Sequence, residues 1–385
     1  MESKSTNTPL EQTNISMESK PTGILKVIPG LLFMFLIAAF AYGTKDLGFA
    51  QWTGLEAIIK KNWKFGATYL HLNYIVIVLL IGMLIRNTIG IPGWAQAGVK
   101  TSRLFIKMGV ILLGSLYSLT ELAKLGGTSI ALIVTFVFGT ILLVMFLAKR
   151  ANMHPASAAC LAAGVGVCGV SAIVATSPAV KARTQDVAYA IATILTFGLV
   201  CLFTFPILGK LIGLTPSQFG AWAGTGILNS GQVLAAALAF DPGTVDNPSV
   251  SLKVGEVFNL TRVIFLPLVV LALTFLYARS AQTTEGATVA SGSLLSKFPL
   301  FVLGFVATVA LTSAGVFGDT VPASDVLKSF RATYSWFFAI GLTGLGLQIS
   351  FQEMRKAGGQ PLIIGTIAGL VKAVGSLLVV LWLID

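Results

Sequence analysis

The sequence predicts an all-α, multi-pass membrane protein with inverted repeats, and three features of the chain lead to this fold class. Of its 385 residues, 55% are hydrophobic and only 11% are charged, whereas about a quarter of a soluble domain is usually charged. Nine apolar runs are long enough to cross a bilayer as helices. Two further apolar stretches are broken by glycines, which a membrane protein tolerates only where protein or a water-filled cavity covers the opened backbone.

Charge and cysteine content exclude several other classes of protein. The net charge is +11, but Lys and Arg stand singly at the ends of apolar runs, as they do beside membrane-spanning helices. Without a basic patch that contains aromatic residues, nucleic acid is not an expected partner. Cys160, Cys168 and Cys201 have no disulfide or metal-ligand spacing, and His71 and His154 each stand alone. No enzyme activity, metal or cofactor is therefore expected.

The chain divides into four predicted parts. Residues 1–22 are polar and are predicted to form a disordered tail. Residues 23–71 hold a peripheral first helix and an interfacial segment at 52–64, where lysines lie beside tryptophans. Residues 72–213 form a first repeat with a broken stretch at 155–180, and residues 214–385 form a second repeat with a broken stretch at 216–240.

The nine predicted spans follow the apolar runs. They cover residues 24–42, 72–89, 101–117, 128–148, 187–212, 256–278, 298–317, 326–347 and 361–384. Each run suffices to cross the hydrocarbon core at about 1.5 Å per residue. The two glycine-broken stretches are additional to these spans.

An internal repeat appears when residues 105–127 are aligned with residues 337–359. Nine of the 23 aligned positions are identical without a gap, which is more than shared hydrophobicity produces. The two broken stretches also align, at an offset of 60, and a helix that carries Pro206 or Pro267 follows each of them. The offsets fit a duplication in which the second unit is permuted.

The repeat leaves two arrangements for the broken stretches. If both cross the membrane they run in the same direction, although residues 105–127 and their copy run in opposite directions. If both are re-entrant hairpins, every pair of counterparts is inverted. Hairpins also gather Lys149, Arg150, Lys181 and Arg183 on one side, which the positive-inside rule makes cytoplasmic. The amino terminus would then lie inside and the carboxyl terminus outside.

Short motifs around both breaks resemble those of a known family. They are Val-Cys-Gly-Val-Ser-Ala-Ile at 167–173, Gln-Val at 232–233, Leu-Thr-Arg-Val at 260–263 and Leu-Gly-Leu at 345–347. From about Leu79 to its end, the chain resembles the YeiH-type membrane proteins, which are described as sulfate exporters. The resemblance implies a transporter related to bile-acid symporters and sodium/proton antiporters. In those proteins, broken helices that cross the membrane hold the substrate.

The glycine-rich breaks also predict an anion site from their chemistry. Helix termini at a break offer unpaired N–H groups and about half a positive charge each. The residues predicted to bind substrate there are Gly166, Cys168, Gly169, Ser171, Asn229, Ser230 and Gln232. The alternative is that the glycines only allow close helix packing, and packing is the preferred explanation for Cys168.

Two cations within apolar runs complete the predicted site. Arg262 lies about two turns into its run, where a charge costs at least about 2.5 kcal/mol, and its planar fork suits a sulfate, sulfonate or carboxylate. With its neighbours Asn259 and Thr261, it is the main side chain predicted to face the anion. The alternative is a pair with Glu256, although a spacing of six residues is poor on one helix face. For Lys372, substrate binding and a structural role are equally favoured.

We therefore expect a secondary transporter of the cell (inner) membrane that exports a small anion by alternating access. Sulfate, sulfite, a sulfonate or a small carboxylate would suit the site. The alternatives are a cation/proton antiporter, for which Glu256 is the candidate carboxylate, and a symporter of organic anions with Na+. A membrane receptor or scaffold without transport is a third alternative. The expected partners are the anion, the lipid bilayer, H+ or Na+ as coupling ion, and a second copy of the chain in a homo-oligomer.

Overall fold

A computed structural model describes residues 24–44, 52–62, 73–281, 300–319, 323–356 and 359–384, and these residues form helices without a β-strand. The all-α class is thus confirmed. Four of the helices are long and apolar enough to cross a membrane, or six spans result if each of two bent helix pairs counts as one. The predicted tail at 1–22 and His71 lie outside the described residues.

Most predicted runs correspond to observed helices. These are α1 (Ile24–Tyr42), α4 (Tyr74–Thr88), α6 (Ser102–Leu113), α7 (Leu119–Arg150), α10 (Thr184–Leu211), α15 (Leu300–Ser313), α16 (Asp325–Leu347) and α18 (Gln360–Leu383). Helix α7 begins nine residues before its predicted start, because Ser118 and Glu121 form a capping box that satisfies the first N–H groups. Glu121 also pairs with Lys253 at 3.1 Å.

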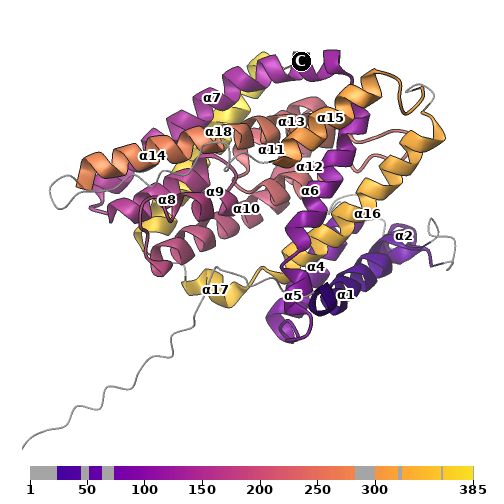
Figure 1. The fold of residues 1–385 in the computed structure, drawn as a ribbon, viewed down its shortest axis with the longest axis horizontal. Coiled ribbons are helices and arrows are strands. Elements are labelled where there is room, and N and C mark those ends of the chain that lie inside the picture. The colour runs from indigo at the N-terminus through magenta and orange to yellow at the C-terminus, as the bar shows by residue number, and fades with distance from the viewer. Residues whose placement is uncertain are drawn as a thin grey trace, which may run out of the picture.

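The helices form two groups that lie side by side (Figure 1). One group consists of α1, α4, α6, α15 and α16, with the short helices α2 (Gly54–Asn62) and α5 (Gln96–Val99) at its edge. The other consists of α7, α10, α18 and the helices of residues 155–281. Helix α6 lies where the two groups meet.

Helices α6 and α16, which carry the two copies of the repeat, pack directly against each other. Their contacts are reciprocal, so that a residue and its repeat counterpart have equivalent neighbours on the other helix. Such reciprocity is what a two-fold axis between two copies produces. The contacts are Phe105 with Phe337, whose ring centroids are 5.9 Å apart, Gly109 with Phe338, and Gly341 with Ile106.

The first broken stretch contains α8 (Pro155–Gly166) and α9 (Val170–Thr176), and it folds back on itself. Leu161 in α8 and Thr193 in α10 both contact Gly365 in α18. Further along α18, Gly369 contacts Phe197 of α10, and Lys372 contacts Gly166 of α8. Helices α8 and α10 therefore run in the same direction beside α18. The chain between them must return to the side on which α8 began, so this stretch is a hairpin.

The second broken stretch, with α11 (Pro216–Gly226) and α12 (Ser230–Phe240), is a hairpin as well. The ring of Phe219 near the start of α11 stacks on that of Phe240 at the end of α12, with centroids 4.0 Å apart. The next helix, α13 (Val250–Ile264), contacts both of these ends. Its Ser251 donates through Oγ to the Pro216 carbonyl at 2.9 Å and through N–H to Asp241 Oδ2 at 3.1 Å.

The tips of the two hairpins meet. Gly169, at the tip of the first hairpin, has φ 77° and lies directly against Leu228 and Asn229 at the tip of the second. A residue with a Cβ atom would be strained in this left-handed conformation and would also press on the Leu228 carbonyl. Gly169 is therefore required both by its backbone conformation and by the close approach of the two tips.

One predicted span is wrong in its continuity. Residues 256–278 do not form one helix, because α13 ends at Ile264 and α14 (Leu266–Ala281) continues at an angle of 41°. Pro267 explains the bend, since proline lacks the N–H of a continuous helix and its ring clashes with the preceding turn. The bend follows directly after the turn that carries Arg262.

Candidate functional site

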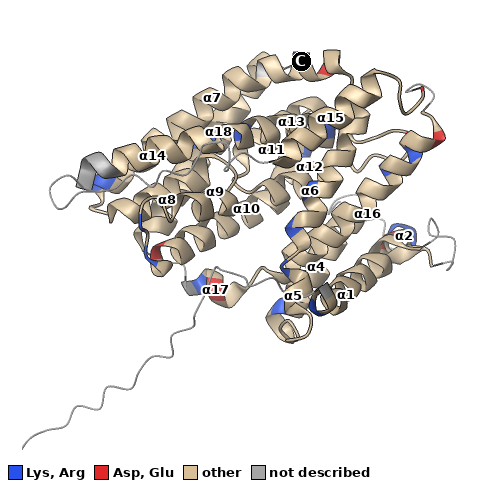
Figure 2. Ribbon diagram, viewed as in Figure 1, with Lys and Arg blue, Asp and Glu red and all other residues tan. Residues whose placement is uncertain are grey.

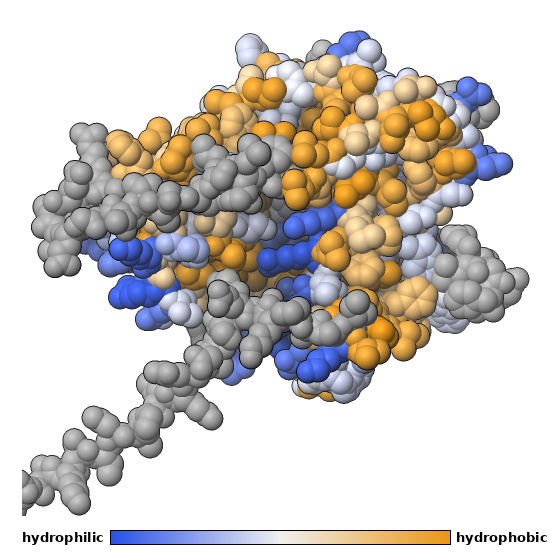
Figure 3. All heavy atoms as spheres, in the orientation of Figure 1, coloured by the Kyte–Doolittle hydropathy of each residue, from blue (hydrophilic) through white to orange (hydrophobic). Residues whose placement is uncertain are grey.

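A cavity of about 270 Å³ lies between α6 and the two hairpin tips. In Figure 3, hydrophilic residues gather at a hollow in the middle of a largely apolar face, where α6 lies in Figure 1. Helices α6, α9, α12 and α13 contribute most of the walls, and α15 and α16 contribute Phe301 and Leu345. Residues from both helix groups therefore line this single cavity.

Helix α12 begins at the cavity wall. Asn229 is its N-cap, and the side-chain oxygen accepts a hydrogen bond from Gly231 N–H at 3.0 Å. Ser230 lines the cavity, and no described residue forms a hydrogen bond with its buried hydroxyl oxygen. The N–H groups of Gln232 and Val233 donate to the Asn229 carbonyl, so this helix end attracts an anion through its partial positive charge. This wall is therefore suited to an acceptor-rich, negatively charged ligand.

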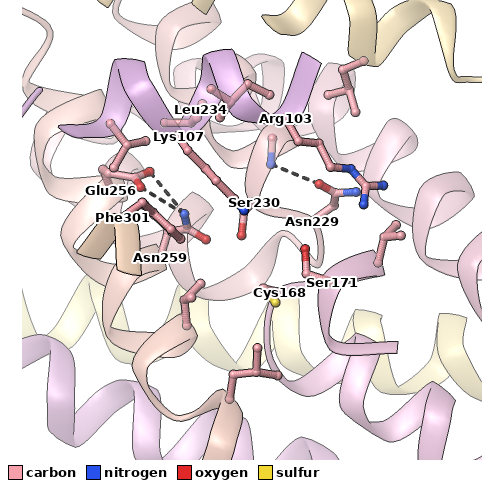
Figure 4. A pocket seen from close by; sticks show the side chains of 17 residues that line it. Arg103, Lys107, Cys168, Ser171, Asn229, Ser230, Leu234, Glu256, Asn259 and Phe301 are labelled. Carbon is pink, nitrogen blue, oxygen red and sulfur yellow. Dashed lines mark hydrogen bonds between the residues drawn. The ribbon is translucent and has the colours of Figure 1, made fainter. Parts of the chain in front are cut away.

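Two cations on α6 face this wall. Arg103 and Lys107 are one helical turn apart, and both line the cavity. In Figure 4, Arg103 extends toward Asn229, and Lys107 extends toward Ser230. The Lys107 ammonium lies 5.7 Å from the centroid of the Phe301 ring. The site predicted from the sequence did not include these two residues, although two cations four residues apart in an apolar run could have indicated it.

Glu256 on α13 is the acidic residue among the residues that line the cavity. It is 1% exposed. Its two carboxyl oxygens accept hydrogen bonds from Asn259 Nδ2 at 3.3 and 3.2 Å, as Figure 4 shows. The cavity thus combines two cations, one carboxyl group and several neutral donors.

Five of the predicted site residues line the cavity, namely Cys168, Ser171, Asn229, Ser230 and Asn259. The other six are not among its lining residues. These are Gly166, Gly169, Gln232, Thr261, Arg262 and Lys372. The structure thus brings together parts of both breaks, as predicted, but it places the two predicted cations elsewhere.

Arg262 is fully buried and is not among the lining residues of the cavity; both terminal nitrogens of its guanidinium bind protein groups, while Nε has no partner among the described residues. Nη1 donates to the Ile227 carbonyl at 2.6 Å, and Nη2 donates to Asn259 Oδ1 at 2.9 Å. The Ile227 carbonyl lies just beyond the last residue of α11, where the helix dipole is negative. The prediction that Arg262 is the main charge facing the anion therefore does not match the geometry, because the opened helix end already binds it.

Lys372 is placed in a similar way at the first hairpin. It is 1% exposed, and its ammonium donates to the carbonyls of Val165 and Gly166 at 2.8 and 3.0 Å. These carbonyls belong to the last turn of α8. Each hairpin thus has a buried cation at the carbonyl end of its first arm. A positive charge is favourable there, and the hydrogen bonds satisfy groups that a continuous helix would pair internally.

The remaining predicted residues have packing or hydrogen-bonding partners away from the cavity. Gly166 packs against Ile141 of α7. Gln232 is fully buried and donates to the Leu195 carbonyl of α10 at 3.3 Å. The Thr261 hydroxyl donates to the Val257 carbonyl and contacts the Ser129 hydroxyl at 2.9 Å. Close packing at Gly166 and the side-chain contacts of Gln232 and Thr261 therefore connect the hairpins and α13 to neighbouring helices.

Apolar helices, two facing hairpins and a charged central cavity define a transporter-like membrane protein. Residues 29–365 match the family described as Conserved hypothetical protein 698, and the chain belongs to this family. This assignment agrees with the resemblance to YeiH-type proteins.

Similar proteins in several bacteria carry the name UPF0324 membrane protein. One from Nitratidesulfovibrio vulgaris is 45% identical over 366 residues, which is 93% of this chain and 95% of the relative. A second protein from the same organism is 42% identical, over 96% of this chain and 97% of the relative. One from Bacillus cereus is 29% identical, over 84% of this chain and 92% of the relative. These relatives support a membrane protein along nearly the whole chain.

Proposed function

We propose that this protein is a secondary transporter of a small anion and that the cavity at the hairpin tips is its substrate site. One observation carries the proposal. Arg103 and Lys107 face the start of α12 across the cavity, where the Ser230 hydroxyl has no partner among the described residues. Fixed cations opposite helix N–H groups are the arrangement that recognises a sulfate, sulfite, sulfonate or carboxylate.

The buried cations support a carrier that does not use Na+ at the breaks. In some transporters, a coupling cation binds to unwound backbone carbonyls and the carbonyl ends of half-helices. Here Lys372 and Arg262 already occupy the carbonyl ends of α8 and α11. This favours an anion carrier over the alternative of a symporter that carries Na+ with an organic anion.

The proposed topology has two re-entrant hairpins that enter from opposite sides of the inner membrane. Arg86 pairs with Glu353 of α17 (Phe351–Lys356), and Gln360 donates to the Ala151 carbonyl at 2.7 Å. These contacts place the carboxyl-terminal ends of α4 and α7 at the same edge of the molecule. Figure 2 shows Lys and Arg along this edge, near α5, α17 and the start of α10. The positive-inside rule makes it cytoplasmic.

Export is the proposed direction. An inside-negative potential favours the exit of each negative charge by about 2.3 kcal/mol per 100 mV. In the alternating-access scheme, the two helix groups move relative to each other about the hairpin tips, with α6 carrying its cations past the start of α12. The cavity then opens in turn to the two sides of the membrane.

Flux into proteoliposomes tests the proposal. Sulfate, sulfite, isethionate and acetate are each supplied under a set potential, with and without Na+, to vesicles that contain the wild type or a variant. At least one anion should enter faster than into protein-free vesicles. Arg103→Gln should reduce that flux about tenfold or more, since a lost charge-assisted hydrogen bond costs about 1.5–3 kcal/mol.

The matched control is Arg150→Gln, which removes an exposed arginine at the end of α7. It should leave the flux close to that of the wild type. If no anion moves, or if both variants behave alike, the proposal is wrong. Movement of Na+ against H+ without any anion flux would instead support the cation/proton antiporter.

A further inference from the structure

Glu256 has an unusual position for a carboxyl group in an anion site. It is 1% exposed and lines the same cavity as Arg103 and Lys107, yet no ion pair among the described residues includes it. Its hydrogen-bond donor is the neutral amide of Asn259. A buried carboxylate that forms no ion pair is costly, and binding a proton removes that cost.

The charged groups around Glu256 determine whether it binds or releases a proton when an anion enters the cavity. The charged and titratable side chains around it are Arg103 and Lys107 from α6, Cys168 from the first hairpin tip, Tyr117 between α6 and α7, and Lys253 and Arg262 on α13 itself. Lys253 is paired with Glu121, and Arg262 is bound to Asn259 and Ile227. Arg103 and Lys107 are thus the cations that Glu256 and a bound anion would share.

We infer that Glu256 is the proton site that couples anion transport to H+, so that a proton is carried in the same direction as the anion. A divalent anion then moves with one net negative charge, on which the membrane potential still acts in the direction of export. This inference rests on the proposed function. An anion bound between Arg103 and Lys107 brings a like charge close to Glu256, and a like charge disfavours the ionised carboxylate. Because such coupling is reciprocal, a proton on Glu256 strengthens anion binding by the same factor.

A chain of hydrogen bonds connects this proton site to a hairpin tip. Asn259 donates to Glu256 and accepts from Arg262 Nη2 at 2.9 Å, and Arg262 Nη1 donates to the Ile227 carbonyl at 2.6 Å. A neutral Glu256 accepts a weaker hydrogen bond from the Asn259 amide than an ionised one does. Protonation therefore loosens the Asn259 side chain, which positions the guanidinium of Arg262. Protonation thus acts on the residue that holds the carbonyl end of α11.

The test measures anion and H+ movement together. Proteoliposomes with lumenal pyranine receive external sulfate or isethionate, which stay ionised and do not carry protons through lipid themselves. In the wild type, the lumen should acidify as the anion enters. The apparent KM should rise with pH, approaching about tenfold per pH unit in the range where Glu256 loses its proton. In Glu256→Gln, the lumen should not acidify, and the KM should change less than about twofold over that range.

Glu353→Gln is the control, because this exposed carboxylate pairs with Arg86 outside the cavity. It should retain the wild-type pH dependence. Proton uptake by the wild type in unbuffered detergent solution on addition of sulfate or isethionate provides a second measurement if Glu256→Gln does not fold. About one proton per chain is expected.

The outcomes separate the two proposals. Anion flux without lumenal acidification, or unchanged pH dependence in Glu256→Gln, overturns the proton site and leaves the anion carrier intact. If the wild type moves neither sulfate nor isethionate nor any other anion of the panel, the proposed function fails, and this inference fails with it.

Discussion

Replacement of Arg262 by methionine tests the role that the structure gives to this buried cation. The change keeps an unbranched side chain but removes the hydrogen bonds to Ile227 O at 2.6 Å and Asn259 Oδ1 at 2.9 Å. Hydrogen bonds from a charged group contribute about 1.5–3 kcal/mol each, so two contribute about 3–6 kcal/mol. Loss of the charge also removes a burial cost of about 2.5 kcal/mol. The free energy of unfolding should therefore fall by about 0.5–3.5 kcal/mol.

The assay is unfolding of the purified protein in mixed detergent and SDS, followed by tryptophan fluorescence, with sulfate binding measured on the same samples. Arg150→Met, at an exposed arginine, is the control and should unfold as the wild type does. An Arg262→Met protein that is as stable as the wild type but no longer binds the anion would refute the reasoning. In that case the guanidinium would be a ligand, as the sequence alone suggested.

Three further changes test the hairpins and the cavity. Single cysteines at Asn152 and Gln185, in a background without native cysteines, should react with an impermeant reagent from the same side, and reaction from opposite sides would mean that the first broken stretch crosses the membrane. Gly169→Ala should lower the free energy of unfolding by about 1–3 kcal/mol. Gly139→Ala, at a helical position with open space around it, should leave it unchanged. Equal effects of the two changes would contradict the close contact of the tips. Ser171→Ala should raise the apparent KM about tenfold, and an unchanged KM would remove this hydroxyl from the site.

The sequence predicts most of the fold because bilayer thickness fixes the length of apolar runs and glycines mark the breaks. The starts of both broken stretches at Pro155 and Pro216 agree with the structure. The bend at Pro267 was not predicted. Hydropathy does not change across that proline, so the apolar run appears continuous although the backbone is not.

The site could be predicted only in part, for a physical reason. Sequence indicates that Arg262 and Lys372 are buried charges, but it does not reveal that the opened ends of α11 and α8 supply carbonyls to bind them. Arg103 and Lys107 were missed because their run resembles the other spans. Only packing of α6 against the hairpin tips determines which of its faces meets the start of α12.

Protection of a cysteine at Ser230 tests most directly whether the anion binds at the start of α12. Ser230→Cys, in a background without native cysteines, is reacted with an anionic methanethiosulfonate reagent in the presence of increasing amounts of the transported anion. The anion should slow this reaction at concentrations near its KM and leave the reaction of a cysteine at Asn152 unchanged. If the anion is transported but slows neither reaction, its binding site lies outside this cavity.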